Sequence, residues 1–254
     1  MKKSVDKKKA YILGAGPIGL VCGWKLAESG YDVTLYERSR RVGGMCSSWQ
    51  WKDFTLDVGP HIFDAPDKVL TEFWKREFGH LMQEGEFYCQ NVQGESFDKY
   101  YNYPLSWEEL SNFPNKDREK IIAEIGGITD YQKAIAKTYK DYMDAQVGPT
   151  LRSMFYEKYP EKIWGISTDD MTPDWAPKRI EFRNKVTPFY HKQWNAVGKY
   201  GTGCVYERIR DKIIKLGGIF EFNHQVDNIT ANERVISEIS FSNGKKVKLN
   251  KEDK

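Results

Sequence analysis

A glycine-rich segment near the N-terminus has the residue types that bind a pyrophosphate through the backbone. It reads Gly14, Ala15, Gly16, Pro17, Ile18 and Gly19, which fits the pattern G-x-G-x-x-G. Gly14 permits a tight turn, Gly16 lets backbone N–H groups approach phosphates, and Gly19 lets a helix pack against a strand. Because a helix N-terminus carries partial positive charge, such a site needs no lysine. The glycine segment (residues 14–19) is therefore predicted to bind a dinucleotide.

An acidic residue follows the glycine segment at the distance that a dinucleotide site requires. Glu37 stands 18 residues after Gly19. A carboxylate in this position accepts hydrogen bonds from a ribose 2′-OH. The same negative charge repels a 2′-phosphate, which argues against NADP as the ligand.

The elements around these residues are those of a Rossmann-like fold. Residues 10–13 form a short apolar run that predicts a buried parallel strand. The following helix has Leu20, Trp24 and Ala27 on one stripe and ends near Gly30. Residues 32–36 alternate between apolar and polar and predict a second strand. The predicted fold class is therefore α/β, with a parallel sheet that binds a nucleotide.

The residues after Glu37 distinguish FAD from NAD. The pattern Glu37-x-x-x-Arg41-x-Gly43-Gly44 resembles the family of FAD-dependent amine oxidases, protoporphyrinogen oxidases and UDP-galactopyranose mutases. Arg41 suits a charge-assisted bond to the diphosphate, a bond of roughly 1.5–3 kcal/mol. The glycine pair lets the backbone pass close to the ribityl chain. The resemblance implies FAD as the cofactor and adds to the cofactor-binding set the flanking residues Arg38 and Met45. In the alternative reading, the arginines only form a solvated loop.

Two further segments extend this resemblance to the flavin and the adenine. Residues 57–61 resemble the family's D-x-G-x-H segment, which runs beside the isoalloxazine ring and would contribute Gly59 and Pro60. His61 is the one catalytic candidate, and the alternative is a turn histidine without chemistry. Residues 59–63 are especially like the mutases, but the next two residues depart from the mutases' usual His-Thr. In the family's later strand pair, Val226 would touch the adenine through its backbone.

The middle of the chain is predicted to form a mainly helical substrate lobe. Residues 156–180 resemble the family's lobe over the substrate, where Trp164 would stack a ring and Arg179 or Arg183 would meet an anion. In the alternative interpretation, which the sequence supports equally, Trp164 belongs to a core and both arginines lie on the surface. The expected organisation is a first nucleotide-binding part, the helical lobe and a return to the nucleotide-binding domain, with ranges 1–65, 66–195 and 196–254.

Local signals place the individual elements of the lobe and of the return. Helices are predicted for residues 66–78 and 129–147, with a break at Gly148 and a new helix from Pro149. Ser106 followed by Glu109 resembles a capping box. The segment 201–218 predicts another amphipathic helix, with Val205, Ile209, Ile213 and Leu216 on one face and an end at Gly217 and Gly218. Residues 242–244 predict a hairpin turn between two strands.

Composition excludes several other classes of function. Basic and acidic residues number 39 and 36, and no basic stripe with interleaved aromatics supports nucleic-acid binding. The 4 cysteines are scattered without metal-ligand spacing, so no metal is expected. No apolar run reaches the roughly 18–20 residues of a membrane helix. The expected location is the cytoplasm, the expected ligand besides FAD is a small-molecule substrate, and the chemistry must come from the cofactor.

The resemblance covers nearly all of residues 10–249, whereas the family normally continues further. The chain is therefore expected to correspond to the N-terminal half or more of a flavoenzyme, with a second chain as one source of the remainder. We also expect weak or absent FAD retention when the chain is purified alone.

Three functions remain open from the sequence. The favoured one is an FAD-dependent oxidoreductase that transfers a hydride from a substrate to flavin N5. The second is a UDP-galactopyranose-mutase-like isomerase without net redox chemistry. The third is a non-catalytic nucleotide-binding remnant.

Overall fold

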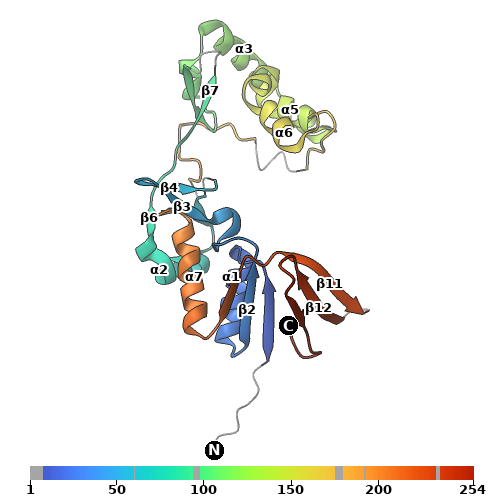
Figure 1. Cartoon of the computed structure of the whole chain (residues 1–254). Coiled ribbons are helices and arrows are strands. Elements are labelled where there is room, and N and C mark those ends of the chain that lie inside the picture. Colours follow the sequence, from blue (N-terminus) through green and yellow to red (C-terminus); the bar gives the residue numbers. More distant parts are fainter. Residues whose placement is uncertain (1–7, 60, 94–97, 175–179, 192, 233–234) are drawn as a thin grey trace, which may run out of the picture. The chain divides into compact units, whose positions relative to one another are not determined.

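The chain divides into two compact units (Figure 1). The computed structural model describes residues 8–59, 61–93, 98–174, 180–191, 193–232 and 235–254. Unit 1 comprises Met1–Gly85 and Gln193–Lys254, and unit 2 comprises Glu86–Lys192. Residues 66–85 thus lie in unit 1, whereas the sequence predicts that the first part of the nucleotide-binding domain ends at residue 65.

A parallel sheet forms the centre of unit 1. Its strands are β1 (Lys9–Leu13), β2 (Asp32–Glu37) and β10 (Ile219–Phe222), with β2 in the middle. The register pairs Leu13 with Tyr36, so the carboxyl ends of β1 and β2 coincide. Ligands of open α/β sheets bind at such carboxyl ends. The register therefore places the glycine segment, which follows β1, and Glu37, which ends β2, at the same edge of the sheet. The two strands predicted from the sequence lead to the same arrangement.

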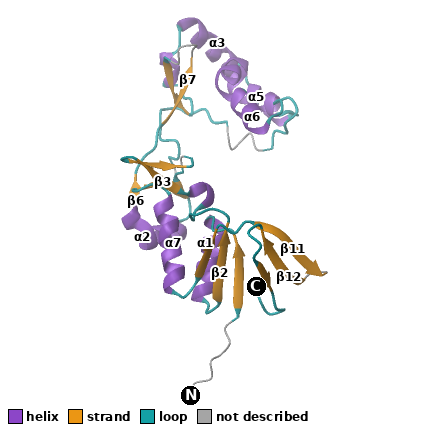
Figure 2. Ribbon diagram, in the orientation of Figure 1, coloured by secondary structure: helices purple, strands orange, loops and turns teal. Residues whose placement is uncertain are grey.

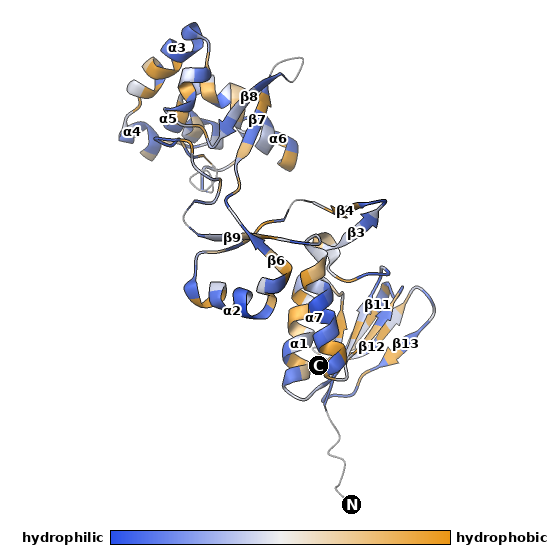
Figure 3. Cartoon of the chain, turned by 90° about the vertical axis from the view of Figure 1, so that its left-hand side faces the viewer, coloured by the Kyte–Doolittle hydropathy of each residue, from blue (hydrophilic) through white to orange (hydrophobic). Residues whose placement is uncertain are grey.

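Two helices cover one face of this sheet. They are α1 (Pro17–Glu28) and α7 (Gly203–Lys215), which lie side by side (Figure 3). Their apolar residues join Val33 and Leu35 of β2 in one buried core. The helix α2 (Lys68–Phe78) packs its aromatic residues on Trp24 of α1, with the Phe78 ring 6.1 Å from the Trp24 ring. This aromatic contact makes α2 part of unit 1.

An antiparallel meander covers the opposite face of the sheet (Figure 2). It consists of β11 (Val226–Asn232), β12 (Val235–Phe241) and β13 (Lys246–Lys248). Tyr36 of β2 packs on Phe241 with ring centroids 4.5 Å apart. The predicted turn at residues 242–244 joins β12 to β13. Unit 1 is therefore a three-layer Rossmann-like domain, which confirms the predicted fold class.

Smaller strands and turns complete unit 1. The short helices η1 (Gly44–Cys46) and η2 (Gly79–Leu81) are 3-10 turns. A sheet of β5 (Phe63–Ala65), β9 (Trp194–Gly198) and β6 (Met82–Glu84) is antiparallel, with β9 in the centre. The β3–β4 hairpin consists of β3 (Ser48–Trp51) and β4 (Phe54–Asp57).

A carboxylate connects the β3–β4 hairpin to α7. Asp57 accepts hydrogen bonds from the hydroxyl of Ser48, from the N–H of Thr202 at 3.1 Å and from the Thr202 hydroxyl at 2.7 Å. The N–H of Gly203 in turn donates to Ser48 Oγ at 2.7 Å. These bonds satisfy backbone donors that the start of a helix otherwise leaves unpaired.

Unit 2 is mainly helical, with one hairpin. The hairpin pairs β7 (Cys89–Gln93) with β8 (Lys99–Tyr103). The helical elements are η3 (Glu109–Asn112), α3 (Asn115–Gly126), α4 (Asp130–Ala134), α5 (Tyr139–Leu151), the π-helical turn η4 (Arg152–Tyr156) and α6 (Lys158–Trp164). A separate core forms between them around Met143, Leu151 and Tyr101.

Local capping divides one helix that the sequence predicted as continuous. Residues 129–147 form α4 and α5 rather than a single helix, because Thr138 begins a new one. Its hydroxyl accepts the N–H of Asp141 at 3.0 Å, and Asp141 accepts the N–H of Thr138 at 3.1 Å. Gly148 has φ 81° and interrupts α5, so a helical turn restarts at Pro149 as predicted.

The predicted capping box at Ser106 and Glu109 is wrong in one half. The N–H of Glu109 does donate to Ser106 Oγ at 3.1 Å. The Glu109 carboxylate does not return to the Ser106 backbone, because it accepts hydrogen bonds from the side chains of Asn102 and Asn112. A short 3-10 turn results in place of a capped α-helix.

Gly19 has no room for a side chain. A Cβ there would overlap the carbonyl oxygen of Gly14, whereas a Cβ on Gly16 would meet no atom within 4 Å. Since the obstacle is backbone, we expect Gly19→Ala to lower the free energy of unfolding by roughly 1–3 kcal/mol. Gly16→Ala is the matched control and should change it little. Urea denaturation of both variants checks this, and equal midpoints would contradict it.

Asp57 makes the stability of unit 1 sensitive to acid. Burial raises the pKa of Asp57, but the hydrogen bonds from Ser48 and Thr202 outweigh burial and lower it. A carboxyl with a lowered folded-state pKa stabilises the fold above its unfolded-state pKa, and this contribution disappears as pH falls through the lowered value. We expect Asp57→Asn to have a lower free energy of unfolding than wild type at about pH 7. Between about pH 5 and pH 3 the free energy of unfolding should fall less in Asp57→Asn than in wild type.

Urea unfolding at each pH measures this difference. Asp53→Asn, in the exposed turn of the same hairpin, is the control and should follow wild type. If the free energy of unfolding falls by the same amount between about pH 5 and pH 3 in wild type and in Asp57→Asn, Asp57 does not have this role.

Candidate cofactor-binding site

The turn between β1 and α1 has a fixed backbone conformation. Gly14 has φ +102°, a left-handed value that favours glycine, and its N–H donates to the carbonyl of Tyr36 at 2.7 Å. Gly16 is extended and precedes Pro17, which occupies the first helical position. The N–H of Leu20 donates to the Gly16 carbonyl at 2.9 Å. The glycine segment thus turns the chain from the strand directly into α1.

The outer side of this turn is open. A Cβ placed on Gly14 or Gly16 would meet no atom within 4 Å. Among the described residues, no side chain caps α1, and its first turn has no acidic residue. The start of α1, with its N–H groups and the positive end of its dipole, is therefore open, which is the arrangement in which helix N-termini bind phosphates.

Glu37 lies against the turn. It is only 7% exposed, and its Oε2 accepts the N–H of Ala15 at 2.8 Å. Its Oε1 accepts the N–H of Ser39 at 2.8 Å. Each carboxylate oxygen can accept a second hydrogen bond. Glu37 therefore fixes the turn and the following residues, and it keeps acceptor capacity for a hydroxyl group.

The diglycine loop (residues 41–48) packs on the same turn. The N–H of Gly43 donates to the carbonyl of Ala15 at 2.8 Å. A Cβ on Gly44 would lie 3.4 Å from the Cα of Gly16, so the two backbones are close together. Gly43 and Gly44 both have positive φ, at +98° and +54°. The predicted glycine pair is therefore beside the glycine segment because backbone contacts hold it there.

Among the predicted cofactor contacts, two arginines and one methionine of this region are exposed. Arg38 and Arg41 are exposed, and the Arg41 guanidinium lies 5.7 Å from the centre of the Trp49 ring. The Ser39 hydroxyl donates to the Arg41 carbonyl at 2.7 Å. Met45 is 70% exposed. Arg41 is thus available to an anion while Trp49 supports its position.

Two predicted residues lie elsewhere in unit 1. His61 is half-buried, and its Nδ1 is 2.6 Å from the carbonyl oxygen of Gly59, so the ring is folded onto its own turn. Because a carbonyl only accepts, Nδ1 carries the proton of this hydrogen bond. Val226 begins β11 and packs with Tyr36 and Phe241. Pro60 lies outside the described residues.

The predicted substrate residues belong to unit 2. Trp164 ends α6 and is 55% exposed, so it is not a core residue. Arg183 is 9% exposed and therefore not a surface residue. Its Nη1 donates to the Thr187 hydroxyl at 2.7 Å, and its Nη2 donates to Glu181 at 2.7 Å. These bonds, with others to backbone carbonyls of the same segment, give Arg183 a structural role. Arg179 lies outside the described residues.

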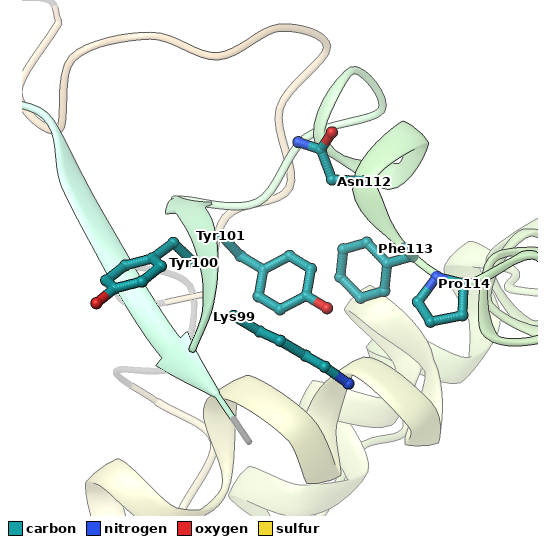
Figure 4. Close-up of a pocket in the computed structure, with 6 residues that line it drawn as sticks. All are labelled: Lys99, Tyr100, Tyr101, Asn112, Phe113 and Pro114. Carbon is teal, nitrogen blue, oxygen red and sulfur yellow. The ribbon is translucent and has the colours of Figure 1, made fainter. Parts of the chain in front are cut away.

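A shallow pocket of about 400 Å³ in unit 2 contains none of the predicted site residues (Figure 4). It is lined by Lys99, Tyr100, Tyr101, Asn112, Phe113 and Pro114. The Tyr101 ring packs against Phe113 with centroids 4.5 Å apart, whereas Tyr100 points away from them (Figure 4).

Some residues that organise the site were not found from the sequence. Ser39 contacts Glu37, and Trp49 contacts Arg41. Asp57 begins the predicted D-x-G-x-H segment, but its bond to Thr202, which joins the β3–β4 hairpin to α7, was not predicted. Serine and tryptophan at these positions match no motif. The close glycines of 198–203 were the available signal for the Asp57 contact, because Gly201 and Gly203 leave no space for a Cβ against Ser48.

Comparison with known proteins agrees with this geometry. Residues 12–76 match the family model described as NAD(P)-binding Rossmann-like domain. A probable UDP-galactopyranose mutase of Klebsiella pneumoniae is 24% identical over 218 residues, which cover 82% of this chain and 54% of the mutase. The L-amino acid oxidase Cdc18 of Crotalus durissus cumanensis is 35% identical over 193 residues, 73% of this chain and 36% of the oxidase.

A solved structure shares the fold. The crystal structure of a reduced UDP-galactopyranose mutase has a TM-score of 0.75 at 22% identity, over 95% of this chain and 54% of the mutase chain. The chain thus spans about half of the mutases it matches, and less of the oxidase. Among the described residues, no helix has the length and apolar character needed to cross a membrane. The chain contains a Rossmann-like nucleotide-binding domain, and it is similar to UDP-galactopyranose mutases and L-amino-acid oxidases, as its motifs indicated.

Proposed function

We propose that this chain binds FAD and forms the cofactor-binding part of an FAD-dependent oxidoreductase. The observation that carries the proposal is the convergence of the glycine segment, Glu37 and the diglycine loop around an open turn. The motif from Glu37 to Gly44 resembles that of FAD-dependent enzymes, and the chain is similar to a mutase and to an L-amino acid oxidase of the kinds that this resemblance named. NAD(P) and FAD share the adenosine diphosphate group, so the NAD(P)-binding description of residues 12–76 is compatible with FAD.

Each group of residues would bind one part of the cofactor. The N–H groups at the start of α1 would receive the diphosphate, with Gly14 and Gly16 leaving room for it. Glu37 would accept a ribose hydroxyl with its remaining lone pairs, while its negative charge disfavours a 2′-phosphate. Arg41 would form a charge-assisted bond to a phosphate. Arg38, Met45, Gly59, Pro60 and Val226 remain predicted cofactor contacts.

The chemistry would be a two-electron oxidation. When bound, FAD would supply a two-electron acceptor at N5 for a hydride from a C–H or N–H bond of the substrate; the substrate would also lose a proton, and an external electron acceptor would reoxidise the cofactor. His61 is the candidate for moving a proton, because in the neutral ring whose Nδ1–H bonds to Gly59 the acceptor is Nε2. Trp164 is the candidate for stacking a small-molecule substrate.

The proposed compartment is the cytoplasm, consistent with 4 cysteines that are all free.

A mutase is the second candidate function. The match over 82% of this chain and the TM-score of 0.75, both to mutases, favour it. Such an isomerase needs reduced flavin but causes no net oxidation of the sugar. The discriminating assay supplies FAD with an artificial electron acceptor in one arm, and UDP-galactopyranose with dithionite-reduced FAD in the other. Dye reduction with an amine or amino acid supports the oxidoreductase, and sugar isomerisation only after reduction supports the mutase. No turnover in either arm with an intact fold leaves a non-catalytic binding protein.

Gly16→Ala tests the open turn directly. The backbone of Gly16 is extended, with φ −73°, so alanine is allowed there, but its methyl group would occupy the space in front of the α1 N-terminus. We expect the FAD dissociation constant to rise by at least about tenfold, because the methyl group keeps the phosphates from the backbone N–H groups. Quenching of flavin fluorescence on titration with protein measures it.

Gly79→Ala is the matched control for this variant. A Cβ on Gly79 also meets no atom within 4 Å, and its φ of −55° suits alanine. FAD affinity that is unchanged in Gly16→Ala, or reduced equally in Gly79→Ala, would count against the turn as the diphosphate site.

Arg41→Ala tests the charge-assisted bond to a phosphate. Loss of a hydrogen bond between charged partners should raise the FAD dissociation constant by roughly 10- to 100-fold. This rise should be smaller at high salt, because salt screens the interaction in wild type. Arg40→Ala removes the same charge from the neighbouring exposed position and is the control. If both variants bind FAD alike at low and high salt, Arg41 has no specific role in binding.

A further inference from the structure

The Asp57 contact fastens both strands of the β3–β4 hairpin to α7. Both carboxylate oxygens of Asp57 lie 3.1 Å from the N–H nitrogen of Thr202, and the Ser48 hydroxyl bonds to Asp57 from the paired position on β3. Thr202 makes no side-chain cap for its own helix, so the hairpin supplies the partners for this helix end. The contact is therefore reciprocal, with α7 holding the hairpin and the hairpin capping α7.

Glycines bring the two backbones into direct contact. A Cβ on Gly203 would lie 2.5 Å from the backbone nitrogen of Ser48, and a Cβ on Gly201 would lie 2.8 Å from Asp57 Oδ1. A side chain at either position would push the hairpin away from the helix. Since α7 is part of the buried core, this contact gives the hairpin a fixed support.

The opposite face of the hairpin gives no such support. The register pairs Trp49 with Leu56 and Trp51 with Phe54, and these four residues are between 37% and 61% exposed. Burial of apolar surface is the main stabilising contribution that a hairpin can gain from its domain. Because these side chains remain exposed, the position of the hairpin depends on the polar face that carries Ser48 and Asp57.

The hairpin continues directly into the diglycine loop. The N–H of Val58 donates to the carbonyl of Ser47 at 3.2 Å, and the N–H of Ser47 donates to the carbonyl of Gly44 at 3.1 Å. Gly44 then lies against Gly16, and Gly43 bonds to Ala15. A chain of direct contacts thus leads from Thr202 through Asp57 to the glycine segment.

We propose that Asp57 is a positioning residue for the cofactor, which holds the diglycine loop against the glycine segment by fastening the β3–β4 hairpin to the start of α7. The proposal rests on the proposed FAD-binding function for its effect on affinity. It does not require Asp57 to touch the cofactor. Loss of the Asp57 contact releases the diglycine loop while the parallel sheet and its helices stay folded.

The experiment compares two aspartates of unit 1 that bond to backbone N–H groups near a helix start. Asp57→Ala removes the hairpin contact, and Asp67→Ala removes the ordinary cap of α2, where Asp67 accepts the N–H of Leu70 at 2.9 Å. Thr202→Val and Thr202→Ser form a second pair, since only serine keeps the hydroxyl that donates to Asp57. Hydrogen exchange of the ligand-free full chain is followed in peptides covering residues 41–48, and FAD affinity is measured by fluorescence quenching.

We expect amide exchange in residues 41–48 to accelerate about tenfold in Asp57→Ala and in Thr202→Val, with FAD dissociation constants raised about tenfold. Thr202→Ser and Asp67→Ala should match wild type in both measurements. Exchange in residues 41–48 that is unchanged in Asp57→Ala and Thr202→Val, or equally accelerated in Asp67→Ala, overturns the proposal.

The exchange measurement separates this proposal from the proposed function. If wild type does not bind FAD, the proposed function fails, and exchange in residues 41–48 still decides whether Asp57 positions the diglycine loop. If Asp57→Ala does not fold, the two Thr202 variants decide by the same measurements, with Thr202→Ser expected to restore the slow exchange that Thr202→Val loses.

Discussion

The structure of the nucleotide-binding unit depends on how the backbone groups of residues 14–16 are paired. The N–H of Gly14 bonds to β2, the N–H of Ala15 bonds to Glu37, and the carbonyl of Ala15 bonds to Gly43. Buried backbone groups need such partners, and here they come from two other segments, the end of β2 and the diglycine loop. The backbone groups on the inner side of the turn are thereby hydrogen-bonded. On its outer side, the N–H groups at the start of α1 remain available to a ligand.

This pairing gives Glu37 two roles that reinforce each other. Its carboxylate is nearly buried, which is costly without hydrogen bonds, and the N–H groups of Ala15 and Ser39 compensate for that cost. The same bonds orient the carboxylate at the carboxyl end of β2, where a ribose would lie. A binding group that is held in place before the ligand arrives loses less entropy on binding.

Packing on both faces keeps this edge of the sheet in register. On one face, Leu20 of α1 and Ile213 of α7 pack in the same core as Leu35 of β2. On the other face, Phe241 of the meander packs on Tyr36 of β2. Gly23 lets α1 approach the sheet closely, since a Cβ there would lie 3.2 Å from Ile12. A shift of β2 by one residue would exchange its two apolar faces and separate Glu37 from the turn. The core therefore protects the geometry of the binding edge.

The sequence by itself determined the features that depend on neighbouring residues. The glycine segment, its flanking strands, the helix break at Gly148 and the last hairpin follow from local conformational preferences, and the structure has them where they were predicted. Even Glu37 was found by spacing, because a strand, a turn and a helix of ordinary length fix the distance to the next strand. Local rules failed where two signals competed, as at Thr138, whose cap divided a helix that apolar spacing made continuous.

Only the tertiary structure decided the contacts between residues far apart in the chain. The bond from Thr202 to Asp57, the aromatic contact that makes α2 part of unit 1, and the burial of Arg183 rest on partners that no spacing rule connects. A charged or hydroxyl side chain has the same sequence signature whether it faces water or a helix end. Its role is set by the groups that folding brings to it, because desolvation and hydrogen-bond geometry exist only in the packed chain.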